Sequence, residues 1–509
     1  MPLAKETAPS VAAAEPRAAS LLDRRLETAP LESERVKLQG QVTKVAKDDG
    51  TKRRLDTAIN SFVTMLVDGR DLVSDDALET LAALIAKLDE KLSEQINLVI
   101  HHPEFQKLEG SWRGLEHMVF GTETDKDLKI KVLNITKDEL SKEFKKFKGT
   151  SWDKGNLFRK IYTEEFGMPG GQPYGVLIGD YEFSNGAADV AILKGMGQIA
   201  SAAHAPFVAG TAPSMFNLES WTEVAQVQDM AALLEGPEWA TWRGFRESLD
   251  ARYVGLTMPR FLSRLPYGKD NKVDGFDFTE ACEGGDHAKY TWSNAAYAMG
   301  TNITQAHKYY GWTACIRGKN SGGELSGLHV HTFPTADGGK EMKCPTEVNL
   351  DNRTEHELAK LGFAAVQHYK NTDTAAFTSA PNCYLPQEYD DASATANSRL
   401  NGALPYVFVT SRFAHYLNKM LLEAVGSFQD RKSLENWLDN WIHKYVTNDP
   451  NASQAVMASH PLREAEVTVQ EIEGRPGYYT AVFKLRPHYQ LEGVDISLRL
   501  VGSLDKKGG

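Results

Sequence analysis

The sequence has few cysteines and no spacing that would let them act together. Cys282, Cys315, Cys344 and Cys383 lie about 30 to 40 residues apart, and no Cys-x-x-Cys pair occurs. This pattern excludes a disulfide-stabilised scaffold and a zinc ribbon. Isolated thiols are typical of a protein from a reducing compartment, so we expect a cytoplasmic location.

Long apolar runs are also missing. Glu6, Pro9, Glu15 and Pro16 interrupt the first twenty residues, which therefore lack the apolar centre of a signal peptide. No uncharged apolar run reaches the roughly 18 residues that a membrane-spanning helix needs. We therefore expect no direct membrane insertion, and any link to the cell envelope would pass through partners.

Net positive charge is lacking too. Lys and Arg together number 57 against 68 Asp and Glu, which gives a formal net charge of −11 and a field that repels phosphate. Nucleic acid is thereby excluded as the main partner. With 41% hydrophobic and 25% charged residues, the 509-residue chain has an ordinary globular composition, with room for roughly two to four domains.

The strong catalytic signatures are absent from the sequence. There is no G-x-x-x-x-G-K-[ST] phosphate loop, no G-x-S-x-G elbow and no H-E-x-x-H pair. The stretch from Gly195 to Ala200 satisfies G-x-G-x-x-A, but the preceding apolar run already ends at Gly179. A dinucleotide site needs its first glycine directly after the strand, so close helix packing is the favoured interpretation of these glycines.

Two further groups are weak candidates for chemistry. His329 and His331 would share one face of a strand, like the opening of a cupin metal motif, but Thr335 stands near the position where a carboxylate is needed. Cys344 has no histidine at a recognisable offset, which favours an inert thiol. We predict no catalytic residue, cofactor or metal. The alternative is a cytoplasmic metal- or nucleotide-dependent α/β enzyme using these histidines or the Gly195 region.

The N-terminal part divides into an arm and a helical region. Residues 1–54 are poor in large apolar side chains and cannot bury enough surface to fold alone, so they are predicted to form a flexible arm. In residues 55–122 an apolar side chain recurs every three or four positions, which predicts one stripe along a helix. The stripe consists of Leu78, Leu81, Ile85, Leu88, Leu92, Ile96 and Val99. It would pack either on the chain's own core or on a partner helix.

Residues 123–395 alternate between strand-like and helix-like segments. Residues 128–135 alternate like a strand, and 174–180 form a continuous apolar run typical of a strand buried on both faces. A helical segment at 189–203 and another apolar run at 206–210 follow, which predicts a βαβ unit with parallel strands. The stretch 265–350 is rich in Gly, Asp and Lys and is predicted to consist mainly of loops.

Residues 396–509 combine helices with strands. One amphipathic helix is predicted over 412–428, and a second follows Ser433. Three strand-like segments then close the chain, with alternating apolar side chains at Val467, Val469, Tyr479, Ala481, Phe483, Leu485, Val494, Ile496, Leu498 and Leu500. A sheet this small has open edges, so another segment is expected to pair with it, although an ordinary intrachain core explains the alternation equally well.

Several long blocks of the sequence together carry a resemblance to one known family. The upstream blocks are 101–105, 109–115, 179–183, 204–207 and 345–347, and the C-terminal ones are 396–400, 404–406, 412–417, 486–492 and 497–501. They resemble, in the same order, blocks of the large sheath subunit of bacterial type VI secretion systems, and the resemblance extends over roughly residues 55–504. The implied fold is mixed α and β, multi-domain and phage tail-sheath-like.

The resemblance implies a structural and mechanical function without enzymatic activity. Family members pair with a small sheath subunit, and the heterodimers stack on a baseplate as a helical tube around an inner tube of hexameric rings. Contraction of the sheath drives the inner tube and its spike out of the cell. An AAA+ unfoldase then recycles the contracted sheath, mainly through the small subunit.

The resemblance also suggests roles for particular regions. The helical region 55–122 would bind the small subunit through Leu78, Leu81, Ile85, Leu88 and Leu92. Terminal strands in 396–509 would exchange between neighbouring subunits. The side chains on the apolar side of the shared sheet would be Val467, Val469, Tyr479, Ala481, Phe483, Leu485, Ile496, Leu498 and Leu500. Charges that would face the inner tube are Lys419, Glu423, Asp430, Arg431 and Lys432, for which a solvated helix face is the simpler interpretation. The α/β body would occupy 123–395.

Overall fold

The computed structural model describes residues 77–227, 229–276, 278–335, 337–424, 431–449, 451–471 and 479–488, together with residues 50, 53 and 57. The chain divides into two compact units. The first comprises Met1–Val99 and Tyr267–Glu280, and the second comprises Ile100–Pro266 and Ala281–Gly509. No described helix combines the length and apolarity needed to cross a membrane.

The first unit contains one long helix, α4 (Ala77–Ile100), whose final residue belongs to the second unit. The spacing of its apolar residues predicted this helix, and the prediction is confirmed. In the Tyr267–Glu280 segment of the same unit, the Glu280 carboxylate accepts a hydrogen bond of 2.9 Å from the main-chain N–H of Tyr267.

The second unit holds the helices from α5 onward and all described strands. Its α-helices are α5 (Pro103–Phe120), α6 (Lys137–Lys146), α7 (Asn156–Phe158), α8 (Ala187–Ala203), α9 (Met230–Leu234), α10 (Ala240–Arg246), α11 (Ala295–Tyr310), α12 (Asn352–Lys360), α13 (Ala392–Asn401), α14 (Leu404–Ala424), α15 (Arg431–Ile442) and α16 (Gln454–Ser459). Its strands are β1 (Leu177–Phe183), β2 (Phe207–Thr211), β3 (Val254–Met258), β4 (Phe261–Leu262), β5 (Trp292–Ser293), β6 (Glu324–Leu325), β7 (Thr332–Pro334), β8 (Lys340–Met342), β9 (Phe363–His368), β10 (Ala375–Phe377), β11 (Leu462–Glu471) and β12 (Tyr479–Pro487).

A mixed six-stranded sheet forms the centre of the second unit, in the order β1-β2-β3-β9-β10-β6. The first four strands run parallel, and β10 and β6 continue the sheet antiparallel. The predicted βαβ unit is confirmed as β1, α8 and β2. Because β1 is an end strand of this order, one of its two edges pairs with no described strand.

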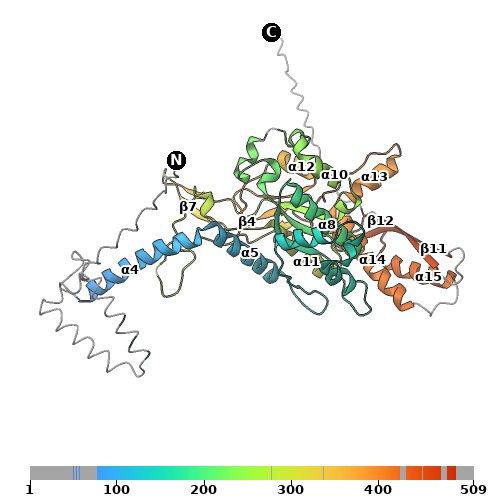
Figure 1. Ribbon diagram of the computed structural model, residues 1–509, viewed down its shortest axis with the longest axis horizontal. Helices are drawn as coiled ribbons and strands as arrows, with labels where there is room; N and C mark the ends of the chain where they lie inside the picture. Colours follow the sequence, from blue (N-terminus) through green and yellow to red (C-terminus); the bar gives the residue numbers. More distant parts are fainter. Residues whose placement is uncertain are drawn as a thin grey trace, which may run out of the picture. The chain divides into compact units, whose positions relative to one another are not determined.

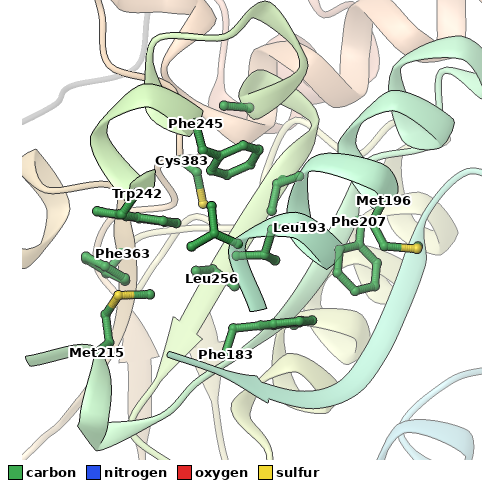
Figure 2. Packing of buried hydrophobic residues seen from close by; sticks show 14 of the residues in the cluster. Phe183, Leu193, Met196, Phe207, Met215, Trp242, Phe245, Leu256, Phe363 and Cys383 are labelled. Carbon is green, nitrogen blue, oxygen red and sulfur yellow. The ribbon is translucent and has the colours of Figure 1, made fainter. Parts of the chain in front are cut away.

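Helices cover both faces of the sheet, and strands that are buried on both faces have continuous apolar sequences. In β2, Phe207 and Ala209 point into one buried cluster and Val208 into another. The first cluster packs α8 and α10 on the sheet, with the Trp242 and Phe363 rings stacked at 5.7 Å between centroids (Figure 2). The second packs α11 on the opposite face.

Two parts of this body differ from the sequence-based prediction. The stretch predicted to be mainly loops, 265–350, contains the 16-residue helix α11, in which every residue from Ala295 to Thr304 is buried. Residues 128–135, predicted as a strand, form neither a helix nor a strand and join no sheet. Period-2 alternation is therefore present there without the main-chain pairing that defines a strand.

The C-terminal part has its own core. Figure 1 shows β11 and β12 as a two-stranded ribbon beside α14 and α15. Phe413 and Leu417 of α14 and Leu438 of α15 are buried against Val467 and Val469 of the ribbon. The predicted helices and the predicted hairpin are thereby confirmed, although α14 already begins at Leu404.

A buried ion pair ties two loops of the body together. The Arg260 guanidinium donates to both carboxylate oxygens of Glu347, from Nη2 at 2.6 Å and from Nε at 2.8 Å. Burial acts to raise the pKa of Glu347, but the charge of Arg260 and hydrogen bonds from His287 and Arg260 outweigh it and hold the pKa below its ordinary value. The Glu347 side chain is only 1% exposed, so it stays ionised because Arg260 is present.

We expect the substitution Arg260→Met to lower the free energy of unfolding by about 3 kcal/mol, because it leaves a buried carboxylate without its cation. The midpoint of urea unfolding, followed by tryptophan fluorescence at pH 7, measures the loss. Arg399→Met is the matched control: its pair with Glu388 is exposed, at 67% and 82%, and should contribute less than about 1 kcal/mol. Equal, small shifts for both variants would contradict the expectation.

Candidate functional site

The β11–β12 ribbon has one apolar and one charged face. Val467 pairs with Phe483, and Val469 pairs with Ala481, so their side chains share the face that packs on α14 and α15. On the other face, Lys484 bonds Glu466 and Arg486 bonds Glu464, each at 2.9 Å. The predicted apolar side chains of the described ribbon therefore meet the chain's own core, and the surface left for a neighbour is the edge of the ribbon.

The outer edge of β12 carries unpaired main-chain groups. In an antiparallel ladder, alternate residues direct their N–H and C=O groups away from the partner strand. The Val469 N–H points out of the ladder, because it donates to a Glu435 carboxylate oxygen at 3.4 Å. Its cross-strand partner Ala481, together with Phe483 and Leu485, therefore presents main-chain groups on the outer edge of β12, where the described residues provide no strand. The predicted strand residues Ile496, Leu498 and Leu500 lie outside the described residues.

The stripe of α4 is exposed where the structure describes its side chains. Ile85 is 51% exposed, Leu88 38% and Leu92 43%. Leu78 and Leu81 lie within the helix, but their side chains are outside the described set. An exposed aliphatic stripe of this length is the kind of surface that a partner helix covers.

The charged residues that the resemblance assigned to the inner tube lie at two helix ends. Lys419 and Glu423 are exposed on the C-terminal part of α14, and Arg431 and Lys432 are exposed at the start of α15. Asp430 lies outside the described residues. These side chains are directed away from the apolar cluster, as either a tube-facing surface or a solvated face requires.

The residues that the sequence analysis considered as cofactor, metal or nucleophile candidates have structural contacts of their own. Gly195 lies inside α8, where a Cβ would come within 2.6 Å of the Phe144 ring, which confirms the close-packing interpretation. His331 Nδ1 is 2.7 Å from the Tyr290 hydroxyl. Among the described residues no group of three or more His, Cys, Asp or Glu side chains could hold a metal ion. Cys344 Sγ lies 3.1 Å from Thr346 Oγ1, and although burial acts to raise the pKa of this thiol, interactions with His368 and Thr346 hold it below its ordinary value; no sequence offset indicated these partners.

The sequence patterns did not predict a groove that the structure shows in the second unit. We call it the α5 groove; it is lined by α5, residues 126–135, the loop 165–176, β1, α11 and α14, and its volume is about 1340 Å³. Its clearest signal in the sequence is a second apolar stripe at helical spacing, formed by Phe105, Leu108, Trp112, Leu115 and Val119 of α5. The resemblance placed this helix in the region 55–122 assigned to the small subunit, but it named none of the residues of α5 for that contact.

His415 is a buried histidine beside this groove. Its Nε2 donates to the main-chain oxygen of Ala203 at 2.8 Å, and its ring lies 6.3 Å from that of His204. Burial lowers the pKa of His415 to about 4; the charges of Arg412 and His204 act in the same direction, and the Ala203 hydrogen bond opposes them. The folded chain therefore keeps this imidazole neutral at pH values where an exposed histidine is protonated.

We expect this histidine to weaken the fold in mild acid. His415 binds a proton near pH 6.5 in the unfolded chain but only near pH 4 in the folded chain. The free energy of unfolding is therefore unaffected by this group above pH 6.5, and it falls by about 2–3 kcal/mol as the pH drops from 6.5 to 4. His415→Gln keeps a donor for Ala203, and should lose less stability than the parent between pH 7 and pH 4.5 in urea unfolding. His443→Gln is the control, since this side chain is 50% exposed, and it should retain the parental pH dependence. The same pH dependence in all three proteins would refute the assignment.

The chain matches family models along most of its length. Residues 82–384 match the EvpB/VC_A0108 tail sheath N-terminal domain, and residues 393–504 match the tail sheath gpW/gp25-like domain of the same family. The chain therefore belongs to the EvpB/VC_A0108 tail sheath family, and the resemblance to large sheath subunits is confirmed.

A curated relative is the type VI secretion system sheath protein TssC1 of Pseudomonas aeruginosa. It is 50% identical over 460 residues, which cover 90% of this chain and 92% of the relative. Two solved structures share 10% sequence identity, and each match covers 77% of this chain and 86% of the other. They are the anti-feeding prophage baseplate, with a TM-score of 0.39, and its helical sheath in the contracted state, with a TM-score of 0.33.

Proposed function

We propose that this chain is the large subunit of a contractile sheath in a type VI secretion system. The observation that carries the proposal is the 50% identity to a sheath protein across 90% of the chain. The function is structural and mechanical: with a small sheath subunit, the chain polymerises around an inner tube, and contraction propels the tube and its spike out of the cell. Assembly takes place in the cytoplasm, on a baseplate, and an AAA+ unfoldase recycles the product through the small subunit.

The ribbon edge supports this proposal physically. A strand from a neighbour that pairs with the outer edge of β12 uses main-chain hydrogen bonds and leaves the core beneath the ribbon intact. Residues 494–501 have the alternation of such a strand, and the predicted flexible arm, residues 1–54, is a second terminal segment that can link neighbouring subunits. Because the edge and the donated strand are different parts of the chain, the contact is heterologous and repeats as a helix of subunits.

The exposed stripe of α4 supports the pairing with the small subunit. Ile85, Leu88 and Leu92 occupy one helix face at the spacing of a helix-to-helix contact. In the same proposal, the charged ends of α14 and α15, with Lys419 and Arg431, face the inner tube.

Electron microscopy of the chain coexpressed with a small sheath subunit tests the proposal, which predicts tubular polymers. Ala481→Pro sharpens the test, because proline removes an N–H that points to the outer edge and leaves the β11 ladder intact. We expect a folded heterodimer with nearly unchanged thermal unfolding and no tubes. Val482→Ala, on the exposed face of the same strand, should still form tubes. Tubes from the proline variant, or discrete monomers from the parent with its partner, would contradict the proposal.

The α4 contact makes a separate prediction. Leu88→Glu combined with Leu92→Glu places charge on the exposed stripe, and should weaken binding of the small subunit at least about tenfold, because a desolvated aliphatic contact is lost. Folding should be unaffected, since both side chains are exposed. Affinity is measured with purified chains by titration calorimetry. Lys87→Glu, an exposed position on the same helix, is the control and should bind as the parent does.

A further inference from the structure

The α5 groove has the size and openness of a polypeptide site. Its volume of about 1340 Å³ exceeds the roughly 300–1,000 Å³ that small-molecule pockets occupy. The described residues that line it all belong to the second unit. None of its lining residues belongs to β12 or to α4, so neither the ribbon edge nor the stripe of α4 accounts for it; Lys419 and Glu423 of α14 are among the lining residues.

Large apolar side chains are exposed along the groove. Trp112 is 65% exposed and Leu108 56% on α5, while Val132 is 69% exposed and Leu133 51% in the segment 128–135. Met168, in the loop at 165–176, is 54% exposed. A protein surface rarely gathers this much aliphatic and aromatic area without a partner that covers it.

One wall of the groove is the open edge of the central sheet. Leu177 bonds to the β2 side, where its N–H donates to the Pro206 oxygen at 2.9 Å. Alternate residues of a strand direct their main-chain groups to opposite sides, so those of Val176 and Ile178 point to the open edge. Both residues line the groove.

Residues 128–135 also line the groove. Three hydrogen bonds hold this segment: Lys131 Nζ bonds Glu165 at 2.6 Å, Lys129 Nζ bonds Gln172 at 3.1 Å, and the main-chain oxygen of Ile135 accepts from the Tyr181 hydroxyl at 2.7 Å. The main-chain N–H and C=O groups between Lys129 and Asn134 make no hydrogen bond within the described part of the chain. The groove is thus lined by the edge of β1 and by a second segment with unpaired main-chain groups.

We propose that an extended strand of the small sheath subunit occupies the α5 groove and pairs with the open edge of β1, so that the sheet is completed by a second chain. This inference rests on the proposed function, because it takes the partner from there. Alternate side chains of the inserted strand cover Leu108 and Trp112 of α5 on one face. The guanidinium of Arg412 also lines the groove, and its buried Nε has no partner among the described residues, so it is available to an oxygen of the incoming chain.

A second copy of this chain is the competing occupant. The described strands of this chain are already placed in its own sheets, which leaves residues 494–501 as the alternating segment that a second copy offers. The proposed function assigns that segment to the outer edge of β12. The small subunit is then the sheath component left to fill the groove, and it must do so in the isolated heterodimer, before any polymer forms.

Hydrogen exchange of the full-length chain, alone and in the purified heterodimer, tests the proposal. Strand insertion should slow the exchange of the amides of residues 129–134 and of Val176 and Ile178 at least about tenfold in the heterodimer. Deletion of residues 489–509 should leave this protection unchanged. A stable heterodimer without protection at these amides overturns the inference and leaves the sheath function standing. Protection that appears only in polymer and disappears with the deletion assigns the groove to a second copy.

A pair of variants on α5 provides a second measurement. Trp112→Glu should weaken binding of the small subunit at least about tenfold, since it charges the centre of the covered surface. Phe120→Glu is the matched control: Phe120 is 84% exposed on the same helix but does not line the groove, and the variant should bind as the parent does. Both side chains are exposed, so both variants should fold. Equal affinities for the two variants overturn the proposal.

Discussion

The unpaired strand edge is the constraint on which the rest of this structure depends. A strand edge exposes a row of hydrogen-bonding groups that another strand can satisfy, and soluble proteins usually cover or charge such edges. Among the described residues, β12 and β1 each have an edge that pairs with no described strand. In both places the core beneath is already packed, as Val467 and Val469 show under the ribbon. Folding and assembly therefore use different groups of the same strands: side chains build the core, and main-chain groups are left for neighbours.

This division keeps the isolated chain from associating at random. The outer face of the ribbon carries the Lys484–Glu466 and Arg486–Glu464 pairs, which are solvated and oppose face-to-face stacking. Only an extended segment with free main-chain groups can use the edge. Since many sequences can supply such groups, specificity must come from the side chains that flank the edge and from the length of the connecting arm.

Periodicity predicted the elements whose burial has one dominant direction. The parallel strands β1 and β2, with α8 between them, the stripe of α4, α15 and the hairpin followed from patterns in the sequence, whereas the parallel strands β3 and β9 were not predicted. It failed for α11, whose Ala, Gly and Thr residues are buried on all sides and give no apolar stripe. It also wrongly predicted a strand at residues 128–135, because the alternation of apolar side chains cannot show whether a neighbouring strand exists.

Contacts between distant residues had no sequence signal of their own. Arg260 and Glu347 are 87 residues apart, and His415 meets Ala203 across 212 residues. The resemblance marked the blocks that contain Glu347 and His415, but not what those side chains contact. The assembly surfaces were predicted as regions, while the edge that is open could be identified only from the register of the ladder.

An assembly joined through strand edges suits a contractile function for a physical reason. Main-chain ladders are satisfied by extended backbone and depend little on the angle between the bodies that carry the strands. Under the proposed function, subunits can therefore rotate and repack their side-chain surfaces while the ladders stay formed. The two sheath states would then differ in side-chain contact between neighbours, and contraction would be a shift between two packings of the same chain, with no chemical step required of it.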